Sequence, residues 1–373
     1  MKRLTGLDLA RSLALMGMVC VNIPLVFSAL DTGAAAQLMD LMAGRAAALF
    51  VVLAGAGNSL MTRGGRQDSA RAAHDRGLIV RRALFLFVLG IGWLPLWPGD
   101  ILHFYGVWML MAAGLFTLPT RALLPLAALF TLAFPVLLAV GPSYETAWDW
   151  ETFTYADLWT PRGFLRNTFY NGLHPVFPWF AFYLGGMWLG RQDLDLPRRP
   201  RRLLVVLVPL WLLMEALGIG LTQALLNQGL SPVEADAIGG VSSMPPMPQY
   251  VLGAGAAAMV VTLVCIPIAE RFPRLCAPLV ATGQLALTHY ASHVFLLLYP
   301  LALLCAPETL ELPGAPRLRM SGPLLLGAMA TWATLSVGLS WAWRRRFPRG
   351  PLEWVMRRLT TPQPQSTARE QQA

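Results

Sequence analysis

Three histidines are the residues of this sequence best suited to acid–base chemistry, because imidazole takes up and releases a proton near neutral pH. His103 lies in the segment DILHFYG, and His174 lies in NGLHPVFPWF beside a proline that suits the first turn of a helix. His293 follows His289 by four residues, which places both rings on one helix face. His103, His174 and His293 are therefore candidate bases, with structural hydrogen bonding as the alternative for each. For His289 we favour interhelical hydrogen bonding.

No metal site is expected. His289 and His293 lack an HExxH motif and an adjoining carboxylate, so the pair does not have the spacing of a zinc site. The four cysteines show no paired spacing, so we expect them to be ordinary buried residues. A Walker loop, a GxSxG motif and a CxxC pair are also absent from the sequence.

Asp8 and Arg11 bring charge into the first apolar segment, where ionisable groups are costly. They are three residues apart, so one helix face can hold them as an ion pair. A structural ion pair is one interpretation. The other is an anion-binding site on the cytoplasmic side that uses Arg11.

Asn22 and Arg45 are two hydrogen-bond donors expected near the outer side of the membrane. Asn22 lies near the outer end of the first apolar segment, and Arg45 opens the second. Polar groups in apolar segments are costly, so both are functional candidates. For Arg45 the structural alternative is an ion pair with Asp31 or Asp40.

The composition requires a membrane to position these residues. The chain is 55% hydrophobic and 13% charged, whereas soluble proteins are about one-quarter charged. Residues 203–217, 251–269 and 324–343 are apolar over roughly the 20 residues that a membrane-spanning helix needs. The net charge of +9 does not indicate nucleic-acid binding, because the basic residues lie between apolar segments. The lipid bilayer is the expected partner.

The apolar runs predict an all-α, polytopic bundle of about ten transmembrane helices. Their centres lie near residues 19, 54, 88, 110, 130, 182, 212, 259, 291 and 332. With both termini in the cytoplasm, most of the 29 basic residues fall inside, as the positive-inside rule requires. The five outside are Arg45, Arg162, Arg166, Arg317 and Arg319.

We predict one transmembrane domain over residues 1–358 and a disordered polar tail over 359–373. The long outer connection 141–173 is acidic and rich in aromatic residues. It fits either a packed cap over the outer mouth of the bundle or an aromatic belt at the lipid headgroups.

Five segments, in order, resemble the heparan-α-glucosaminide N-acetyltransferase-like membrane proteins and the related bacterial DUF418 (YeiB-like) proteins. The resemblance lies in KRLTGLDLARSLALMGMVCVN, GRAAALFVVLAGAGNSL, RRALFLFVLGIGWLPLWPGDILHFYGV, NGLHPVFPWFAFYLGGMWLGRQDL and TGQLALTHYASHVF. The DUF418-like signature covers about residues 170–345. Together the segments span most of the chain up to about residue 300.

The resemblance implies a membrane acyltransferase that takes acetyl-CoA or another acyl-CoA from the cytoplasm and acylates an acceptor reached from outside. Lysosomal members of the family use a histidine in the first luminal loop, but the matching residues 28–44 contain none. Another base must therefore serve, and the order of preference is His174, His103 and then His293. Asp8, Arg11, Asn22 and Arg45 are the expected substrate- or cofactor-binding residues.

Two other classes of function stay open beside the acyltransferase. A small-metabolite transporter or channel could line its path with the same polar residues, and a membrane scaffold would need no chemistry. The expected location is the inner (plasma) membrane, with a small-molecule acceptor as partner. Small-residue helix faces suit contacts within one chain and contacts in a homo-oligomer alike.

Overall fold

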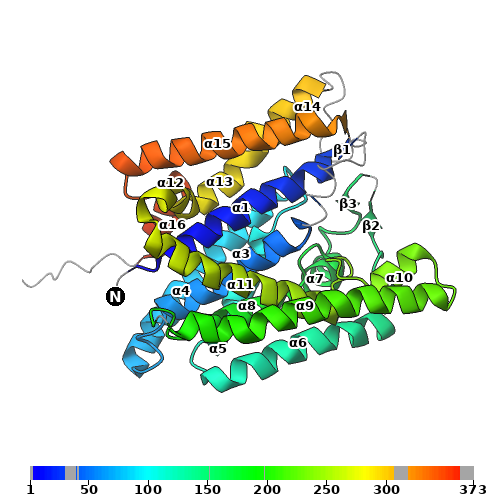
Figure 1. Ribbon diagram of the computed structural model, residues 1–373, viewed down its shortest axis with the longest axis horizontal. Coiled ribbons are helices and arrows are strands. Elements are labelled where there is room, and N and C mark those ends of the chain that lie inside the picture. Colours follow the sequence, from blue (N-terminus) through cyan, green and yellow to red (C-terminus); the bar gives the residue numbers. More distant parts are fainter. Residues whose placement is uncertain are drawn as a thin grey trace, which may run out of the picture.

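The computed structural model describes residues 3–29, 39, 42–150, 152–196, 198–305 and 318–361. The protein is 77% helical with very little strand, which confirms the predicted all-α fold. Figure 1 shows the long helices running side by side along the longest axis of the molecule. The predicted tail over 359–373 lies outside the described residues from position 362 onward.

Nine long helices of the described chain and one interrupted helical segment form the bundle. They are α1 (Thr5–Val26), α3 (Arg45–Met61), α4 (Ser69–Trp93), α5 (Leu102–Leu115), α6 (Thr120–Val140), α8 (Val176–Leu189), α9 (Arg198–Asn227), α11 (Pro248–Arg271) and α15 (Gly322–Arg346). The interrupted segment consists of α12 (Pro273–Gln284), α13 (Ala286–His293), the π-helix η2 (Val294–Leu298) and α14 (Tyr299–Cys305).

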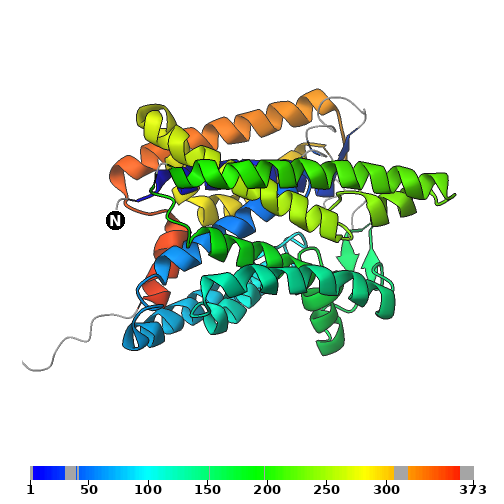
Figure 2. The same ribbon diagram turned by 60° about the horizontal axis from the view of Figure 1, so that its bottom comes forward.

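Short elements close the two ends of the bundle. They are α7 (Pro161–Arg166), the π-helix η1 (Asn167–Asn171), α10 (Pro232–Gly239) and α16 (Pro351–Thr360). Strands β1 (Phe27–Ala29) and β4 (Leu318–Met320) pair in parallel, and β2 (Trp148–Asp149) and β3 (Thr154–Tyr155) form an antiparallel hairpin. The first turn of α1 and α16 lie at one end, called the inner end below, and the β2–β3 hairpin with α7 lies at the opposite, outer end (Figures 1 and 2).

A helix occupies each of the ten predicted centres. Six segments of the described chain are long and apolar enough to cross a membrane: Thr5–Ile23, Thr120–Val140, Arg198–Asn227, Pro248–Arg271, Ala286–Leu303 and Gly322–Arg346. The helices α3, α5 and α8 are apolar but shorter. The chain is thus a multi-pass helical membrane protein, while ten crossings and cytoplasmic termini stay predictions.

The core of the bundle lies where α1, α3, α8 and α11 meet. The apolar windows of α1 and α11 are 72% buried, whereas those of α6 and α9 are 17% buried and face outward. Glycines allow α3 and α8 to touch backbone to backbone. A Cβ added to Gly55 would lie 2.0 Å from the carbonyl oxygen of Tyr183, and one added to Gly186 would lie 2.0 Å from that of Val52.

Candidate functional site

A cavity of about 420 Å³ opens at the inner end of the bundle, and it is called the inner cavity below. Arg3, Asp8 and Arg11 form one part of its wall. The ion pair predicted between Asp8 and Arg11 is present at 2.6 Å, and Arg3 binds the same carboxylate at 2.7 Å. Because Asp8 accepts from both guanidinium groups, the Arg11 side chain is held at the cavity wall, where an anion could reach it.

The inner cavity extends from these arginines to the first residues of α5. Its wall includes Arg82 from α4, Tyr105 from α5 and Tyr290 from α13. The Tyr105 hydroxyl is buried and has no hydrogen-bond partner among the described residues. A buried polar group without a partner is costly in an apolar site. The cavity therefore combines three guanidinium groups with an unused hydroxyl, which suits a long ligand that is anionic at one end and polar further along.

A smaller pocket of about 140 Å³, called the outer pocket below, lies beneath the segment that follows α6. Its wall includes His103 and Phe104 from α5, Asn167 from η1, and Trp148, Phe153 and Tyr155 from the hairpin. The aromatic connection 141–173 is thus packed over the outer end of the bundle, as the cap interpretation predicted. Rings flanking a histidine and an amide make a site that could hold a small acceptor.

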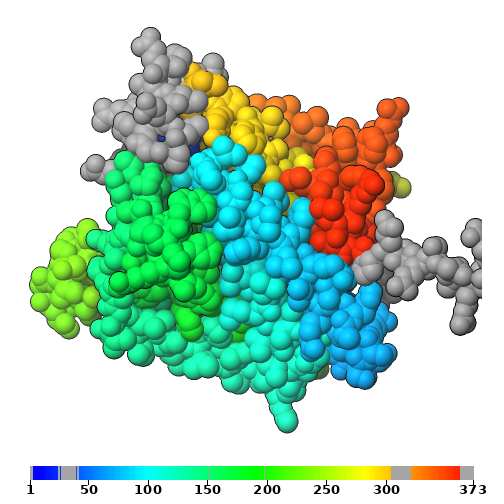
Figure 3. Space-filling model, turned by 180° about the vertical axis from the view of Figure 1, so that it is seen from behind, coloured from blue at the N-terminus to red at the C-terminus, as the bar shows by residue number. Residues whose placement is uncertain are grey.

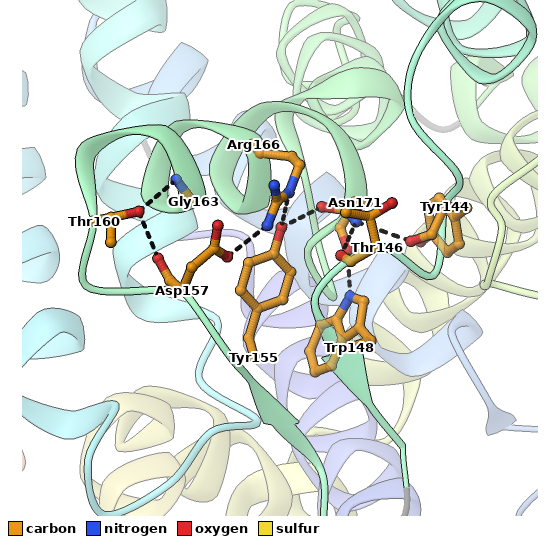
Figure 4. A network of polar contacts seen from close by, with 9 residues as sticks. All are labelled: Tyr144, Thr146, Trp148, Tyr155, Asp157, Thr160, Gly163, Arg166 and Asn171. Atoms are coloured by element: carbon orange, nitrogen blue, oxygen red, sulfur yellow. Dashed lines mark hydrogen bonds and ion pairs between the residues drawn. The ribbon is translucent and has the colours of Figure 1, made fainter.

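Hydrogen bonds around Asn171 and Arg166 hold this cap in place (Figure 4). The Asn171 side chain donates to the Tyr144 and Thr146 carbonyl oxygens, and the Asn171 backbone carbonyl accepts from the Trp148 indole at 2.6 Å. Arg166 donates to the Tyr155 hydroxyl and to the carboxylate of Asp157. Burial raises the pKa of Tyr155, although hydrogen bonding to Arg166 opposes that shift. The walls of the outer pocket are therefore fixed by polar contacts as well as by ring packing.

Residues at the start of α5 line both spaces. Ile101 and Tyr105 face the inner cavity, and His103 faces the outer pocket. Asp100 precedes the helix, is fully buried, and accepts from the His103 backbone N–H at 3.0 Å and from His103 Nδ1 at 2.9 Å. The other ring nitrogen, Nε2, is buried and has no hydrogen-bond partner among the described residues. A carboxylate on Nδ1 and a free Nε2 are the arrangement of an imidazole general base.

Asp100 also connects His103 with the inner cavity. The Tyr290 hydroxyl lies 3.4 Å from Asp100 Oδ1 and accepts from the Ile101 backbone N–H at 3.1 Å. One buried carboxylate thus contacts a histidine in the wall of one space and a tyrosine in the wall of the other.

His293 has a different environment, because both of its ring nitrogens are used. Nδ1 donates to the Tyr290 carbonyl oxygen, and Nε2 lies 3.0 Å from Asn22 Nδ2. Since a carbonyl oxygen can only accept, Nδ1 carries the hydrogen, and Nε2 accepts from Asn22. Both ring nitrogens of His293 are therefore engaged, one of them by the Asn22 amide. The neighbouring His289 bonds Ser340 of α15 at 2.6 Å, which confirms the predicted interhelical hydrogen bond.

The surroundings of His174 and Arg45 differ from those of His103 and His293. The His174 ring packs against Trp179 at 4.5 Å between centroids, and its Nδ1 is buried without a partner among the described residues. Burial and the nearby His103 lower the pKa of His174 to about 3. Arg45 forms an ion pair with Glu215 of α9 at 2.8 Å. The alternative partners Asp31 and Asp40 lie outside the described residues.

Asp100, Tyr105 and Tyr290 are site residues that sequence reasoning missed. For Asp100 a signal was available, because an aspartate three residues before a histidine at a helix start can cap the helix and bind the ring. For Tyr290 none was available, since its contacts with Asp100 and Ile101 join segments 190 and 189 residues apart. No group of three or more His, Cys, Asp or Glu that could hold a metal occurs within the described ranges.

Two family models match the chain. The model described as heparan-alpha-glucosaminide N-acetyltransferase, catalytic, matches residues 3–218, which is more than half of the sequence. The model described as protein of unknown function (DUF418) matches residues 194–363. No curated protein matches the sequence. The matches agree with the resemblance found in the five sequence segments.

Proposed function

The chain belongs to the family of the heparan-alpha-glucosaminide N-acetyltransferase catalytic domain, and from that membership we propose that it is a membrane-embedded acyltransferase. The donor is acetyl-CoA or another acyl-CoA from the cytoplasm. The acceptor is a hydroxyl or amine of a sugar or other small molecule on the opposite side. The inner (plasma) membrane, with the inner end of the bundle in the cytoplasm, is the location that fits the charge distribution.

The residues of the inner cavity suit an acyl-CoA donor. Arg3, Arg11 and Arg82 supply positive charge for phosphate groups. The unpartnered Tyr105 hydroxyl offers a hydrogen bond to a polar group of the pantetheine arm. This distribution, charge toward the inner end and a neutral hydroxyl at α5, follows the distribution of polar groups along acyl-CoA.

The observation that carries the proposal is the position of the Asp100–His103 pair between the inner cavity and the outer pocket. His103 Nε2 takes the proton from the acceptor as its oxygen or nitrogen attacks the acyl carbonyl. Asp100 keeps the second proton on Nδ1 and stabilises the imidazolium that forms. On this geometry we place His103 ahead of His174 and His293 as the base. His103 combines a carboxylate on Nδ1 with an unpartnered Nε2, whereas no described carboxylate contacts His174 and both ring nitrogens of His293 are engaged.

Acyl transfer by the purified, reconstituted protein tests this proposal. With labelled acetyl-CoA and an amino-sugar acceptor, His103→Ala should lower kcat by about 10²- to 10⁴-fold, the usual contribution of a general base. Asp100→Asn should also lower kcat, because an asparagine no longer enforces the Nδ1–H tautomer. His293→Gln is the matched control and should retain most of the activity. Full transfer by the His103→Ala, His174→Ala double variant would contradict histidine base catalysis.

A small-metabolite transporter is the second candidate, because one cavity lies toward each end and residues at the start of α5 line both of them. Reconstituted vesicles distinguish the two functions. Acceptor that crosses without becoming acylated favours transport. Acylated acceptor that appears only when acyl-CoA is supplied favours the transferase.

A further inference from the structure

Tyr290 lines the inner cavity, and its hydroxyl lies 3.4 Å from the carboxylate that binds His103. Tyr290 is 1% exposed and comes from α13, which packs beside α1. Its oxygen accepts the Ile101 N–H at 3.1 Å, and this contact holds the ring of a residue that lines the inner cavity. Its hydrogen points to Asp100 over 3.4 Å, which is longer than an ordinary O–H···O hydrogen bond. The hydroxyl is therefore held by its oxygen and only weakly by its hydrogen.

From this geometry we propose that Tyr290 is a catalytic residue whose hydroxyl donates to the carbonyl oxygen of the acyl donor as negative charge develops there. The assignment rests on the acyltransferase function proposed above. A neutral phenol suits the role, because donors aimed at a developing oxyanion act strongly in a site from which water is excluded.

The two donors suggested by the sequence are engaged elsewhere. Asn22 donates to His293, and Arg45 binds Glu215. Neither lines the inner cavity or the outer pocket. Tyr290 does line the inner cavity and shares a carboxylate with the candidate base, so donor and base lie on opposite sides of one group.

The reaction step balances as follows. The lone pair of the acceptor oxygen or nitrogen forms a bond to the thioester carbon, and the carbonyl π electrons move onto oxygen, which accepts from Tyr290. His103 Nε2 takes the acceptor's proton. When the carbonyl re-forms, the carbon–sulfur bond breaks, and the thiolate receives that proton from His103. The products are the acylated acceptor and the free thiol, and Tyr290 keeps its own proton throughout.

A double-mutant cycle separates direct donation from an effect through Asp100. Tyr290→Phe should lower kcat by roughly 10²- to 10³-fold, as removal of an oxyanion donor usually does, with little change in the KM for the acceptor. The same factor is expected in the Asp100→Asn background, because a direct contact does not pass through the carboxylate. If Tyr290→Phe has no further effect in that background, Tyr290 only positions Asp100 and the proposal is wrong.

An infrared measurement tests the contact between Tyr290 and the acyl carbonyl without requiring turnover. A ketone analogue of acetyl-CoA, with a methylene group in place of sulfur, keeps the carbonyl but cannot transfer it. Its infrared carbonyl stretch should lie at lower wavenumber when bound to the wild-type protein than when bound to Tyr290→Phe. Tyr299→Phe, which removes a hydroxyl that contacts Leu96, is the matched control and should leave the stretch unchanged. Equal frequencies in wild type and Tyr290→Phe overturn the assignment, whereas failure of the wild type to bind the analogue counts against the acyl-CoA function itself.

Discussion

His174 illustrates how a partly buried histidine responds to pH. It lies in the turn between η1 and α8, outside the spanning helices, and packs against Trp179 and Phe104. Burial disfavours its charged form, and the charge of His103 adds to this effect, so the pKa falls to about 3. In the unfolded chain the same ring titrates near 6.5. The unfolded state therefore binds more protons between these two values.

This difference predicts acid sensitivity that one substitution should remove. A lowered histidine pKa gives full stability above about pH 6.5, and stability is lost as the pH falls toward 3. At pH 5 the loss should be about 2 kcal/mol, from 1.4 kcal/mol for each pKa unit. Thermal unfolding in detergent at pH 7.5 and pH 5 should show a smaller difference for His174→Gln than for wild type. His74→Gln, at an exposed position of α4, is the control, and identical differences in all three proteins would contradict the prediction.

Local spacing explains which residue contacts could be predicted. The Asp8–Arg11 pair followed from three-residue spacing, and the Asp100–His103 pair has the same spacing and could have been found in the same way. The His293–Asn22 contact joins residues 271 apart. Spacing carries no information about such a contact, because it depends on how α13 packs against α1. The choice between His103, His174 and His293 depended on contacts of this second kind.

At the scale of elements, α16 forms part of the wall of the inner cavity. Glu353 and Met356 of this helix lie in the cavity wall. Glu353 accepts from the backbone N–H groups of Leu287 and Thr288 at 2.8 and 3.1 Å, so it satisfies donors at the N-terminus of α13. Arg81 donates to the carbonyl of Thr360 at the other end of α16. Figure 3 shows α16, in red, lying between α15 and α4 on this face.

Loss of the Glu353 carboxylate should release α16. Glu353→Ala leaves two backbone N–H groups without their partner, and loss of such a cap costs about 0.5–2 kcal/mol. Trypsin should then cleave after Arg357 and Arg358 several-fold faster, because cleavage needs local unfolding of the helix. Glu270→Ala, at an exposed position of α11, should leave the rate unchanged. Equal rates in the two variants would show that Glu353 does not hold α16.

The sequence predicted the long apolar helices but not the short elements. Ten apolar stretches gave ten helix centres, because a membrane fixes the length of an apolar helix. The break at Leu285, between α12 and α13, and the short helix α16 were not predicted. Both depend on tertiary contacts. A Cβ at Gly283, for example, would lie 1.8 Å from the Asp8 carbonyl oxygen, so α12 approaches α1 there at backbone distance.

At the scale of the whole molecule, the two ends of the bundle differ in chemistry. The inner end carries the arginines at the start of α9 and the end of α15, together with those around α16. The outer end carries the aromatic cap. A bilayer potential and the positive-inside rule both favour placing the basic end in the cytoplasm. In this proposed orientation the inner cavity would face the compartment that contains acyl-CoA, and the outer pocket would face the side of the proposed acceptor.

Accessibility of single cysteines tests this orientation. In a background with the four native cysteines replaced, Ser69→Cys marks the exposed start of α4 at the inner end, and Ser143→Cys marks the exposed start of the cap. In intact spheroplasts a membrane-impermeant maleimide should label Ser143→Cys, because that residue lies outside. Ser69→Cys should react only after the membrane is permeabilised. The reverse pattern would place acyl-CoA on the side of the outer pocket and contradict the two-sided mechanism, and labelling of both before permeabilisation would mean that the two ends do not lie on opposite sides.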